Sequence, residues 1–234
     1  MASTLDTNLI SFYNCNDNGT FPDDGTGSYA GTISWATFSS WGWKVGSCYD
    51  YDGTNDYVTA NPWTLWSPTN YSVSLWFNAD STSNWQRLIE KNTNTSFSYI
   101  LEFLSSNLSV RRAANGSIYQ VTTATAGFST GTRYHIVITF ETSGNVKMYV
   151  DTSLTTWDAT STFGVDSNTY KLWIWAWATW SDNPTWYFNG KIDSIWIRDK
   201  TLTTDEVAEL YNSGDWLEYP FSADTFVPKT TFIM

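Results

Sequence analysis

The chain has 234 residues, which is enough to bury the hydrophobic core of one all-β domain. Its 23 acidic side chains outnumber its 12 Lys and Arg and give a formal net charge of −11, which argues against a nucleic-acid partner, because phosphate binding needs clustered basic groups. No apolar run is long enough to cross a membrane, so we predict no membrane insertion.

The chain begins with a polar N-terminal segment, residues 1–8, that we expect to be loosely held. This segment lacks the basic stretch and the following apolar stretch of a signal peptide. We therefore expect either that a leader is missing from this sequence or that the protein leaves its cell by another route, such as release inside a virus particle. Leu9 to Asn14 (LISFYN) is the first predicted strand, and the Asn, Asp and Gly residues that follow predict a long turn.

Two cysteines, Cys15 and Cys48, leave two states open. They form one disulfide in an oxidising compartment, or they remain two small, half-buried thiols. Their separation along the chain does not decide between these states.

The middle of the chain alternates short β-prone runs with turns rich in Asn, Ser, Thr and Gly. In Tyr71 to Phe77 (YSVSLWF), apolar and polar residues alternate as in a strand with one buried face. This pattern predicts many short strands. Those that follow are Arg87 to Lys91, Tyr99 to Leu104, Leu108 to Arg111, Arg133 to Phe140, Val146 to Asp151 and Lys171 to Trp180.

The last predicted strand runs from Ile192 to Arg198 and follows Asn189-Gly190, a pair that suits a tight hairpin turn. Strict alternation gives this strand two different faces. One face carries Ile192, Ser194, Trp196 and Arg198, and the other carries Asp193, Ile195, Ile197 and Asp199.

A short helix with marked ends follows this strand. Thr203 and Glu206 form a capping box at its start, and Gly214 closes it. A helix this short is not stable alone, so its apolar stripe must dock on a sheet. The stripe consists of Val207, Leu210 and Tyr211.

Two stretches far apart in the chain carry a resemblance to one family. Gly190 to Gly214 fits the pattern G-x-I-D-x-h-x-I, where h is apolar, followed by L-[ST]-x-x-E-[IV]-x-x-L-Y-x-x-G. Lys44 to Val58 resembles the signature G-K-x-G-x-x-x-x-F-D-G-x-[ND]-D-Y-[VI], with Trp43 in place of the first Gly and Tyr51 in place of Phe. The chain therefore resembles the laminin-G-like jelly rolls of the concanavalin A-like lectin/glucanase superfamily.

The resemblance implies an all-β, two-sheet antiparallel jelly-roll sandwich with one short C-terminal helix. It covers residues 9–214, which we take as a single domain. Residues 215–234 lie beyond it, contain Pro220 and Pro228 and show no helical period, so we predict an extended C-terminal arm. Such an arm needs a surface, either on its own domain or on a neighbouring subunit.

A row of tryptophans is the candidate binding surface. Trp173, Trp175 and Trp177 alternate with small or aliphatic residues, so three indoles share one face of a predicted strand. That face either lines the core or, as the family pattern around Ile174 implies, faces the open concave side. There the indoles would stack on the C–H faces of sugars. The platform would extend to Trp180, Trp186 and Tyr187.

The resemblance also implies a calcium site, because many concanavalin A-like domains hold a structural Ca²⁺ between a strand Asp and an early loop. Asp193 occupies the matching strand position, and Asn16, Asp17 or Asp52 would supply further oxygens. Alternatively, Asp193 hydrogen-bonds a neighbouring loop without any metal. No closed ligand motif such as an EF-hand decides between these alternatives.

The chain lacks the paired carboxylates of a jelly-roll glycosidase, which lie on one strand at a spacing such as E-x-D-x-x-E. None of its six Glu residues forms such a pair, and His135, the only histidine, matches a family position that looks structural. We therefore predict no enzyme activity.

The sequence thus predicts a non-catalytic, lectin-like carbohydrate-binding or adhesion domain. We expect this domain to be displayed on a virion or extracellular surface and to contact glycans there. The alternative is a structural or decoration protein of a virion, whose jelly roll and C-terminal arm bind other subunits. A glycoside hydrolase is the third candidate. Fold alone does not rank these three, because this architecture hosts all of them.

Overall fold

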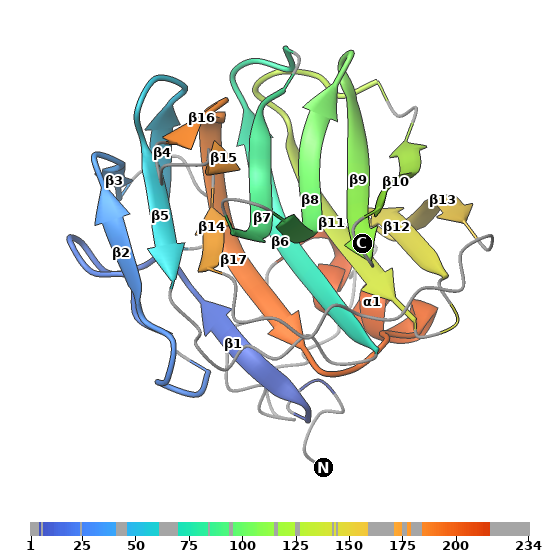
Figure 1. Ribbon diagram of the computed structural model, residues 1–234. Helices are drawn as coiled ribbons and strands as arrows, with labels where there is room; N and C mark the ends of the chain where they lie inside the picture. The colour runs from blue at the N-terminus through green and yellow to red at the C-terminus, as the bar shows by residue number, and fades with distance from the viewer. Residues whose placement is uncertain are drawn as a thin grey trace, which may run out of the picture.

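Two antiparallel β-sheets pack face to face, and one short helix lies outside them (Figure 1). The predicted fold class, an all-β two-sheet sandwich with a C-terminal helix, is therefore confirmed. Within the described ranges, no helix is both long enough and apolar enough to span a membrane. This computed structural model describes residues 5, 7–23, 25–40, 46–60, 70–83, 85–93, 96–114, 117–124, 127–141, 143, 145–158, 171–174, 177–178 and 184–215.

The first sheet, sheet A, has eight strands in the order β13–β12–β11–β6–β17–β4–β3, with β1 paired to β17 beside β4. In that order the bounds are β13 (Ser153–Asp158), β12 (Val146–Val150), β11 (Arg133–Phe140), β6 (Tyr71–Ala79), β17 (Asn189–Arg198), β4 (Cys48–Asp52), β3 (Thr37–Ser39) and β1 (Leu9–Tyr13).

The second sheet, sheet B, has seven strands in the order β10–β9–β8–β7–β14–β5–β2. Their bounds are β10 (Ser117–Ala124), β9 (Asn107–Ala114), β8 (Ser96–Leu104), β7 (Arg87–Thr93), β14 (Lys171–Ile174), β5 (Tyr57–Ala60) and β2 (Gly31–Ser34). A separate two-stranded ribbon joins β15 (Trp177–Ala178) to β16 (Pro184–Thr185).

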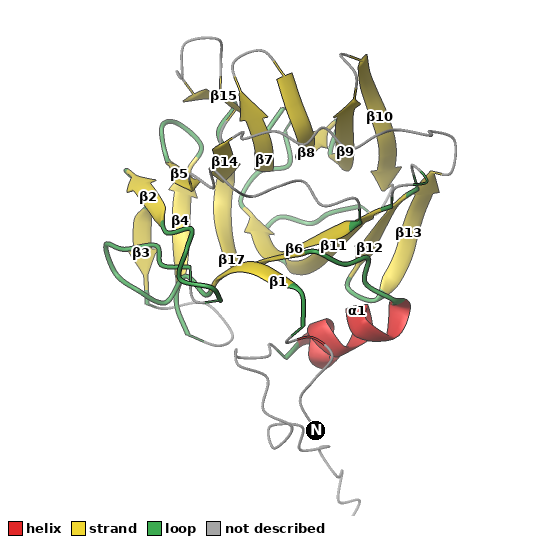
Figure 2. Cartoon of the chain, turned by 60° about the horizontal axis from the view of Figure 1, so that its bottom comes forward, coloured by secondary structure: helices red, strands yellow, loops and turns green. Residues whose placement is uncertain are grey.

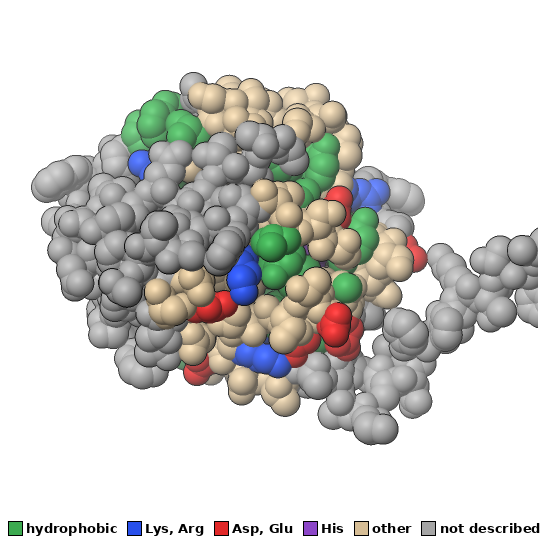
Figure 3. All heavy atoms as spheres, turned by 90° about the vertical axis from the view of Figure 1, so that its right-hand side faces the viewer, with side chains coloured by type: hydrophobic (Ala, Val, Ile, Leu, Met, Phe, Trp, Pro, Cys, Tyr) green, Lys and Arg blue, Asp and Glu red, His purple; other side chains and the backbone are tan. Residues whose placement is uncertain are grey.

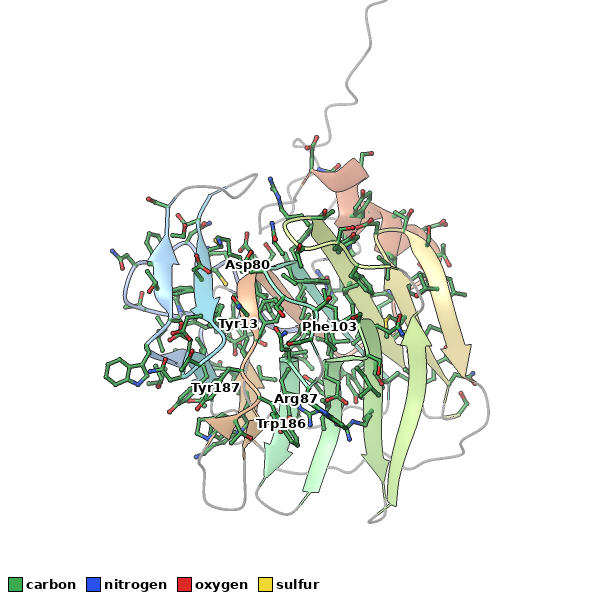
Figure 4. All side chains as sticks on the ribbon, turned by 90° about the horizontal axis from the view of Figure 1, so that it is seen from above. Tyr13, Asp80, Arg87, Phe103, Trp186 and Tyr187 are labelled. Carbon is green, nitrogen blue, oxygen red and sulfur yellow. The ribbon has the colours of Figure 1, made fainter. Side chains whose placement is uncertain are left out.

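One apolar cluster fills the space between the sheets, because each sheet turns its apolar side chains inward. Tyr13 of sheet A and Phe103 of sheet B both point into this space (Figure 4). Cys15 and Cys48 are both buried and are not joined by a disulfide, so the thiol state is the one observed.

The helix α1 (Thr204–Tyr211) lies against the outer face of sheet A (Figure 2). Its predicted capping box is confirmed, because Thr203 and Glu206 each bond the other's backbone N–H. Its backbone then reverses at Asn212, which adopts a left-handed conformation, and a 3-10 turn runs from Asn212 to Gly214. Leu5 is fully buried in the same outer cluster, so this residue of the N-terminal segment is held, contrary to our expectation for residues 1–8.

The strand β17 corrects two predictions. Asn189 and Gly190 are part of the strand and form no hairpin turn. Glycine is needed at position 190 because a side chain there would meet Asn78 and Ala79 of β6. Strict alternation is also wrong, because Ser194 has a φ of 51° and the register with β6 shifts between Asp193 and Trp196. This bulge puts Ile192 in the core together with Ile195 and Ile197, and it leaves Asp193 on the outer face.

The side of the molecule that carries β10 and β13 shows described acidic and basic side chains scattered among polar ones (Figure 3). The described hydrophobic side chains on this side form small separate groups. Interspersed charges of both signs are typical of a solvated surface.

His135 is buried on the outer face of sheet A, where its ring stacks on Trp76 with centroids 4.9 Å apart. A hydrogen bond of 2.8 Å joins its Nε2 to the hydroxyl of Ser74, and its backbone N–H donates to Asp151. Burial lowers the pKa of His135 to about 3, so the ring is neutral at physiological pH. This environment agrees with the structural role that the resemblance implied.

We predict that His135 makes the fold less stable in mild acid. An unfolded histidine has a pKa of about 6.5, so between that pH and the folded value of about 3 only the unfolded chain takes up the proton. This group should cost about 2 kcal/mol of unfolding free energy between pH 7 and pH 5. The stability of the wild type relative to His135→Gln, measured by urea unfolding, should fall by that amount, whereas an unchanged difference would contradict a neutral buried His135.

Candidate functional site

Two exposed tryptophans, Trp85 and Trp186, lie side by side at one end of sheet B. Their side chains are 39% and 41% exposed, and their rings stack with centroids 5.3 Å apart at an interplanar angle of 28°. Both residues have a positive φ, 70° and 56°, which bulky L-residues rarely adopt. Such strain costs on the order of 1–3 kcal/mol per residue and is concentrated at binding and catalytic sites.

Backbone hydrogen bonds hold both residues in these conformations. The N–H of Trp85 donates to the carbonyl of Phe103 on β8 at 2.8 Å, and the N–H of Arg87 donates to the carbonyl of Trp186 at 3.2 Å. The two tryptophan-bearing segments, about a hundred residues apart in the chain, are therefore connected through the start of β7.

The side chain of Gln86 makes a second connection between these segments. Its amide nitrogen donates to the hydroxyls of Ser81 and Ser83, at 3.1 and 2.7 Å. Its amide oxygen accepts the N–H of Asn189 at 2.9 Å, three residues after Trp186. Because Gln86 is buried and bonded on both sides, it fixes the Trp85 turn relative to the start of β17.

A buried cluster of charged side chains lies beneath the tryptophans, on the outer face of sheet B. Glu102 is fully buried, and its two carboxylate oxygens contact Arg87 and Arg111 respectively. The Nε of Arg87 is also 3.7 Å from the carboxylate of Glu90, which is buried as well. A register shift between Arg87 and Ile89 explains how residues three apart in a strand reach the same face.

Each arginine of this cluster also contacts one tryptophan. The guanidinium carbon of Arg87 is 5.3 Å from the ring centroid of Trp186 (Figure 4). That of Arg111 is 5.4 Å from the ring centroid of Trp85. Burial lowers the pKa of Arg87, and the neighbouring carboxylates of Glu90 and Glu102 oppose that shift. The cluster has two positive and two negative groups, so the site under the aromatic pair is neutral as a whole.

The predicted tryptophan row is only partly reproduced. The predicted strand from Lys171 to Trp180 is divided, because β14 ends at Ile174 and Trp177 pairs in the separate β15–β16 ribbon. Trp173 does lie on the opposite side from the core residue Ile174, as the family pattern implied, but it is only 3% exposed and presents no open face. Trp175 and Trp180, and the side chain of Trp177, lie outside the described residues.

The other two predicted residues, Trp186 and Tyr187, are at the site. Trp186 is half of the exposed pair, and Tyr187 is half-buried with its hydroxyl donating to the carbonyl of Pro184 at 2.7 Å. Figure 4 shows Trp186, Tyr187 and Arg87 together at the outer side of sheet B. Sequence reasoning missed Trp85, whose only signal is a lone tryptophan among polar neighbours in a turn.

The predicted calcium ligands do not form a shared set of donors. Asp193 is fully buried, with one oxygen accepting the N–H of Ser194 at 2.7 Å, and burial raises the pKa of its carboxyl well above the usual value. Asp52 pairs with Asn189, four residues before Asp193 along β17 and therefore about 13 Å away. Its carboxylate caps its own turn by accepting the N–H of Thr54.

The early loop does not complete the calcium site either. Asn16 uses its amide oxygen to accept the N–H of Ser47 at 2.8 Å, and Asp17 is exposed. In the part of the chain that is described, no group of three or more His, Cys, Asp or Glu side chains is arranged to hold a metal ion. The described residues therefore do not fit a calcium ion, and calcium binding stays a prediction.

The sequence pattern of the concanavalin A-like lectin/glucanases superfamily matches residues 52–208 of the chain. The chain belongs to this superfamily. Membership confirms the resemblance and agrees with the two-sheet sandwich. No match was found among curated protein sequences.

Three solved structures of this fold are similar to the chain. Domain 4 of AbnA, a GH43 extracellular arabinanase from Geobacillus stearothermophilus, in complex with arabinotriose, aligns with a TM-score of 0.68 at 17% identity over 86% of this chain and 97% of that one. The binding domain of botulinum neurotoxin DC in complex with rat synaptotagmin II aligns with a TM-score of 0.70 at 13% identity, over 91% of this chain and 53% of that one. The binding domain of Paraclostridial Mosquitocidal Protein 1 aligns with a TM-score of 0.71 at 13% identity, over 90% of this chain and 53% of that one.

The TM-scores show that this member of the superfamily shares the fold of these structures, and at such low identity they show the fold alone. The chain spans nearly all of the arabinanase domain and about half of the other two binding domains. The solved structures that share the concanavalin A-like fold of this chain include carbohydrate-binding and receptor-binding domains.

We predict that Glu102→Gln destabilises the fold by about 3–5 kcal/mol, because it leaves the buried Arg87 and the partly exposed Arg111 beside a neutral amide. Glu141→Gln is the matched control, since Glu141 pairs with Lys147 at the surface, where an ion pair contributes less than about 1 kcal/mol. Urea unfolding at pH 7 measures both changes. Equal losses in the two variants would show that Glu102 does not hold the two arginines.

We predict that Asp193→Asn stabilises the fold at pH 7 in the presence of chelator. The unfolded carboxyl ionises above its ordinary pKa of 3.8, whereas burial keeps the folded one protonated to higher pH, so stability falls as pH rises between the two values. Asparagine removes that loss. Thermal unfolding of both proteins at pH 5 and pH 7, with calcium and with chelator, measures this difference in stability. A calcium site at Asp193 would instead make calcium raise the unfolding temperature of the wild type alone.

Proposed function

We propose that this domain binds carbohydrate without cutting it, and that the stacked pair Trp85–Trp186 is the principal sugar contact. The observation that carries this proposal is two strained, exposed indoles, fixed by backbone hydrogen bonds over a buried charged cluster. The apolar C–H face of a sugar ring packs well on indole carbon, and aromatic anchors dominate binding energy at such sites.

Rigidity supports this assignment, because a pre-organised site loses little conformational entropy when a ligand binds. Gln86 and the Arg87 N–H hold the two tryptophan segments together before any ligand arrives. The partly exposed guanidinium of Arg111, at 18% exposure, is the polar group best placed to hydrogen-bond a sugar hydroxyl.

The charge balance favours a neutral glycan over an acidic one. Glu102 and Glu90 already neutralise Arg87 and Arg111, so a bound carboxylate or sulfate would find no uncompensated cation in this cluster. The net charge of −11 would also repel an anionic polymer at low ionic strength. The arabinotriose bound by the arabinanase domain is a neutral sugar of the kind that we expect here.

A hydrolytic function has less support. A glycosidase needs two carboxyl groups that contact the sugar, whereas Glu90 and Glu102 are both inaccessible and engaged by Arg87. A second function, binding of a protein partner, is favoured by the likeness to a domain in complex with synaptotagmin and by the exposed aromatic pair. We further propose that the domain acts outside the cell or on a virion surface, where glycans are met.

The test is a glycan array on the purified chain, run with calcium and with chelator, followed by titration of Trp85→Ala and Trp186→Ala against the best neutral glycan. Each variant should lose at least about tenfold in affinity, because a buried aromatic anchor contributes more than about 1.4 kcal/mol. The control is Leu154→Ala, which trims a side chain that is 51% exposed on β13 of the other sheet.

The outcomes separate the rival functions. Binding that only the tryptophan variants lose supports the proposal, and its response to chelator reports whether calcium takes part. Silence of the folded wild type across a broad array rejects carbohydrate binding and favours the protein-assembly alternative. Release of reducing ends from any polysaccharide, lost in a single Glu→Gln variant, would replace binding by hydrolysis.

A further inference from the structure

A third strained tryptophan, Trp35, lies at the same end of sheet B as the Trp85–Trp186 pair. It follows the edge strand β2 directly, its side chain is 77% exposed, and its φ is 65°. Of the described large hydrophobic side chains that are exposed, all three tryptophans have a left-handed backbone, and only Leu154 does not. An indole of this size left in water by a strained backbone needs an explanation beyond folding.

The strand register places Trp35 level with the pair. Ile33 of β2 lies opposite Val58 of β5, Val58 lies opposite Ile174 of β14, and Ile174 lies opposite Ile89 of β7. Two residues beyond Ile33 comes Trp35, and two residues beyond Ile89, in the same direction along the sheet, comes Arg87. Three strand spacings separate β2 from β7, which is about 14 Å.

Further aromatic side chains occupy the gap between Trp35 and the pair. Tyr57, at the start of β5, lies opposite Ser34 and packs on Trp173 with ring centroids 5.7 Å apart. Tyr57 is also close enough to Tyr187 to contribute, after burial, to the raised pKa of that hydroxyl. We call Trp35, Tyr57, Tyr187, Trp186 and Trp85 the aromatic row.

All five members of the aromatic row are uncharged. Trp35, Trp85 and Trp186 are exposed, and the two tyrosines between them are half-buried with polar hydroxyls. The exposed ends and partly wet centre suit a ligand that offers repeated apolar faces and hydroxyl groups. A linear oligosaccharide has this chemistry, whereas a single sugar ring cannot reach across about 14 Å.

We propose that the site takes a linear, neutral oligosaccharide of several residues, lying across β7, β14, β5 and β2, with Trp35 as its outermost contact. This inference rests on the proposed carbohydrate function and specifies its ligand class, the interior of a polysaccharide chain. The two ends of the row are exposed to solvent, with Trp35 after an edge strand and Trp85 in a turn, so a longer chain is expected to extend past them.

The test is a series of titrations with neutral arabino-, xylo- and cello-oligosaccharides from one to six sugar residues. For the wild type, affinity should rise with length until the chain spans the row and then level off. Trp35→Ala should lose about tenfold in affinity for the longer members while binding the shortest ones unchanged. The control Leu154→Ala should match the wild type at every length.

A second variant guards against a folding defect. Trp35→Gly removes the same side chain and relieves the left-handed backbone, so it should be at least as stable as the wild type in thermal unfolding. Its length dependence should equal that of Trp35→Ala.

Each outcome decides one part of the proposal. A wild-type affinity that is the same for one sugar and for six, or a Trp35→Ala variant that matches Leu154→Ala, overturns the extended site. The carbohydrate function still stands in that case, if Trp85→Ala and Trp186→Ala abolish binding. Absence of binding by the folded wild type to every oligosaccharide overturns both.

Discussion

The bulge at Ser194 in β17 is the constraint on which both faces of sheet A depend. It lets Ile192 and Ile195 both reach the core, although they are three residues apart, and it sends the carboxyl of Asp193 to the outer face. Strict alternation would put either the isoleucines or the acid on the wrong side, because a slip of one residue exchanges the faces of a strand. Since β17 pairs with β1, β4 and β6, the bulge sets which side chains at the centre of sheet A face the core and which, such as Trp196, join the outer cluster with α1.

The two outer faces of the sandwich are used differently. On sheet A the helix α1 covers an apolar cluster that includes Val137 and Trp196, so that face is occupied by the chain itself. On sheet B the outer face instead carries the buried charges of Glu102, Arg87 and Arg111. Buried ion pairs are weak evidence for stability, because desolvation offsets most of their attraction. Here their consequence is geometric, since each arginine supports one tryptophan of the exposed pair.

The sequence patterns were sufficient for the fold, and they named two residues of the candidate site, Trp186 and Tyr187. Capping residues and short alternating runs obey local rules, so α1 and most strands of the sandwich could be predicted from them. The bulges could not, because nothing in the residue types at Ser194 or at Arg87 marks an extra residue in the strand. Those bulges decide which side chains share a face. The charged cluster was missed for this reason, and Trp85 was missed because it is a lone tryptophan in a polar turn, whereas Trp186 and Tyr187 were named as an extension of the tryptophan row.

Positive φ angles connect the local conformation of the chain with its proposed activity. A left-handed backbone at a tryptophan is unfavourable, and Trp35, Trp85 and Trp186 stay 77%, 39% and 41% exposed, so the burial of their indoles offsets only part of that cost. The left-handed conformation changes the direction in which the side chain points. At the end of a strand, regular pleating would direct that side chain into the core or along the sheet edge, and the left-handed residue turns it away from there. Three such residues at one end of one sheet form a fixed set of apolar contacts separated by strand spacings. A polymer with a regular repeat of apolar faces is the ligand that such a fixed spacing selects, and a flexible or purely charged partner gains nothing from it.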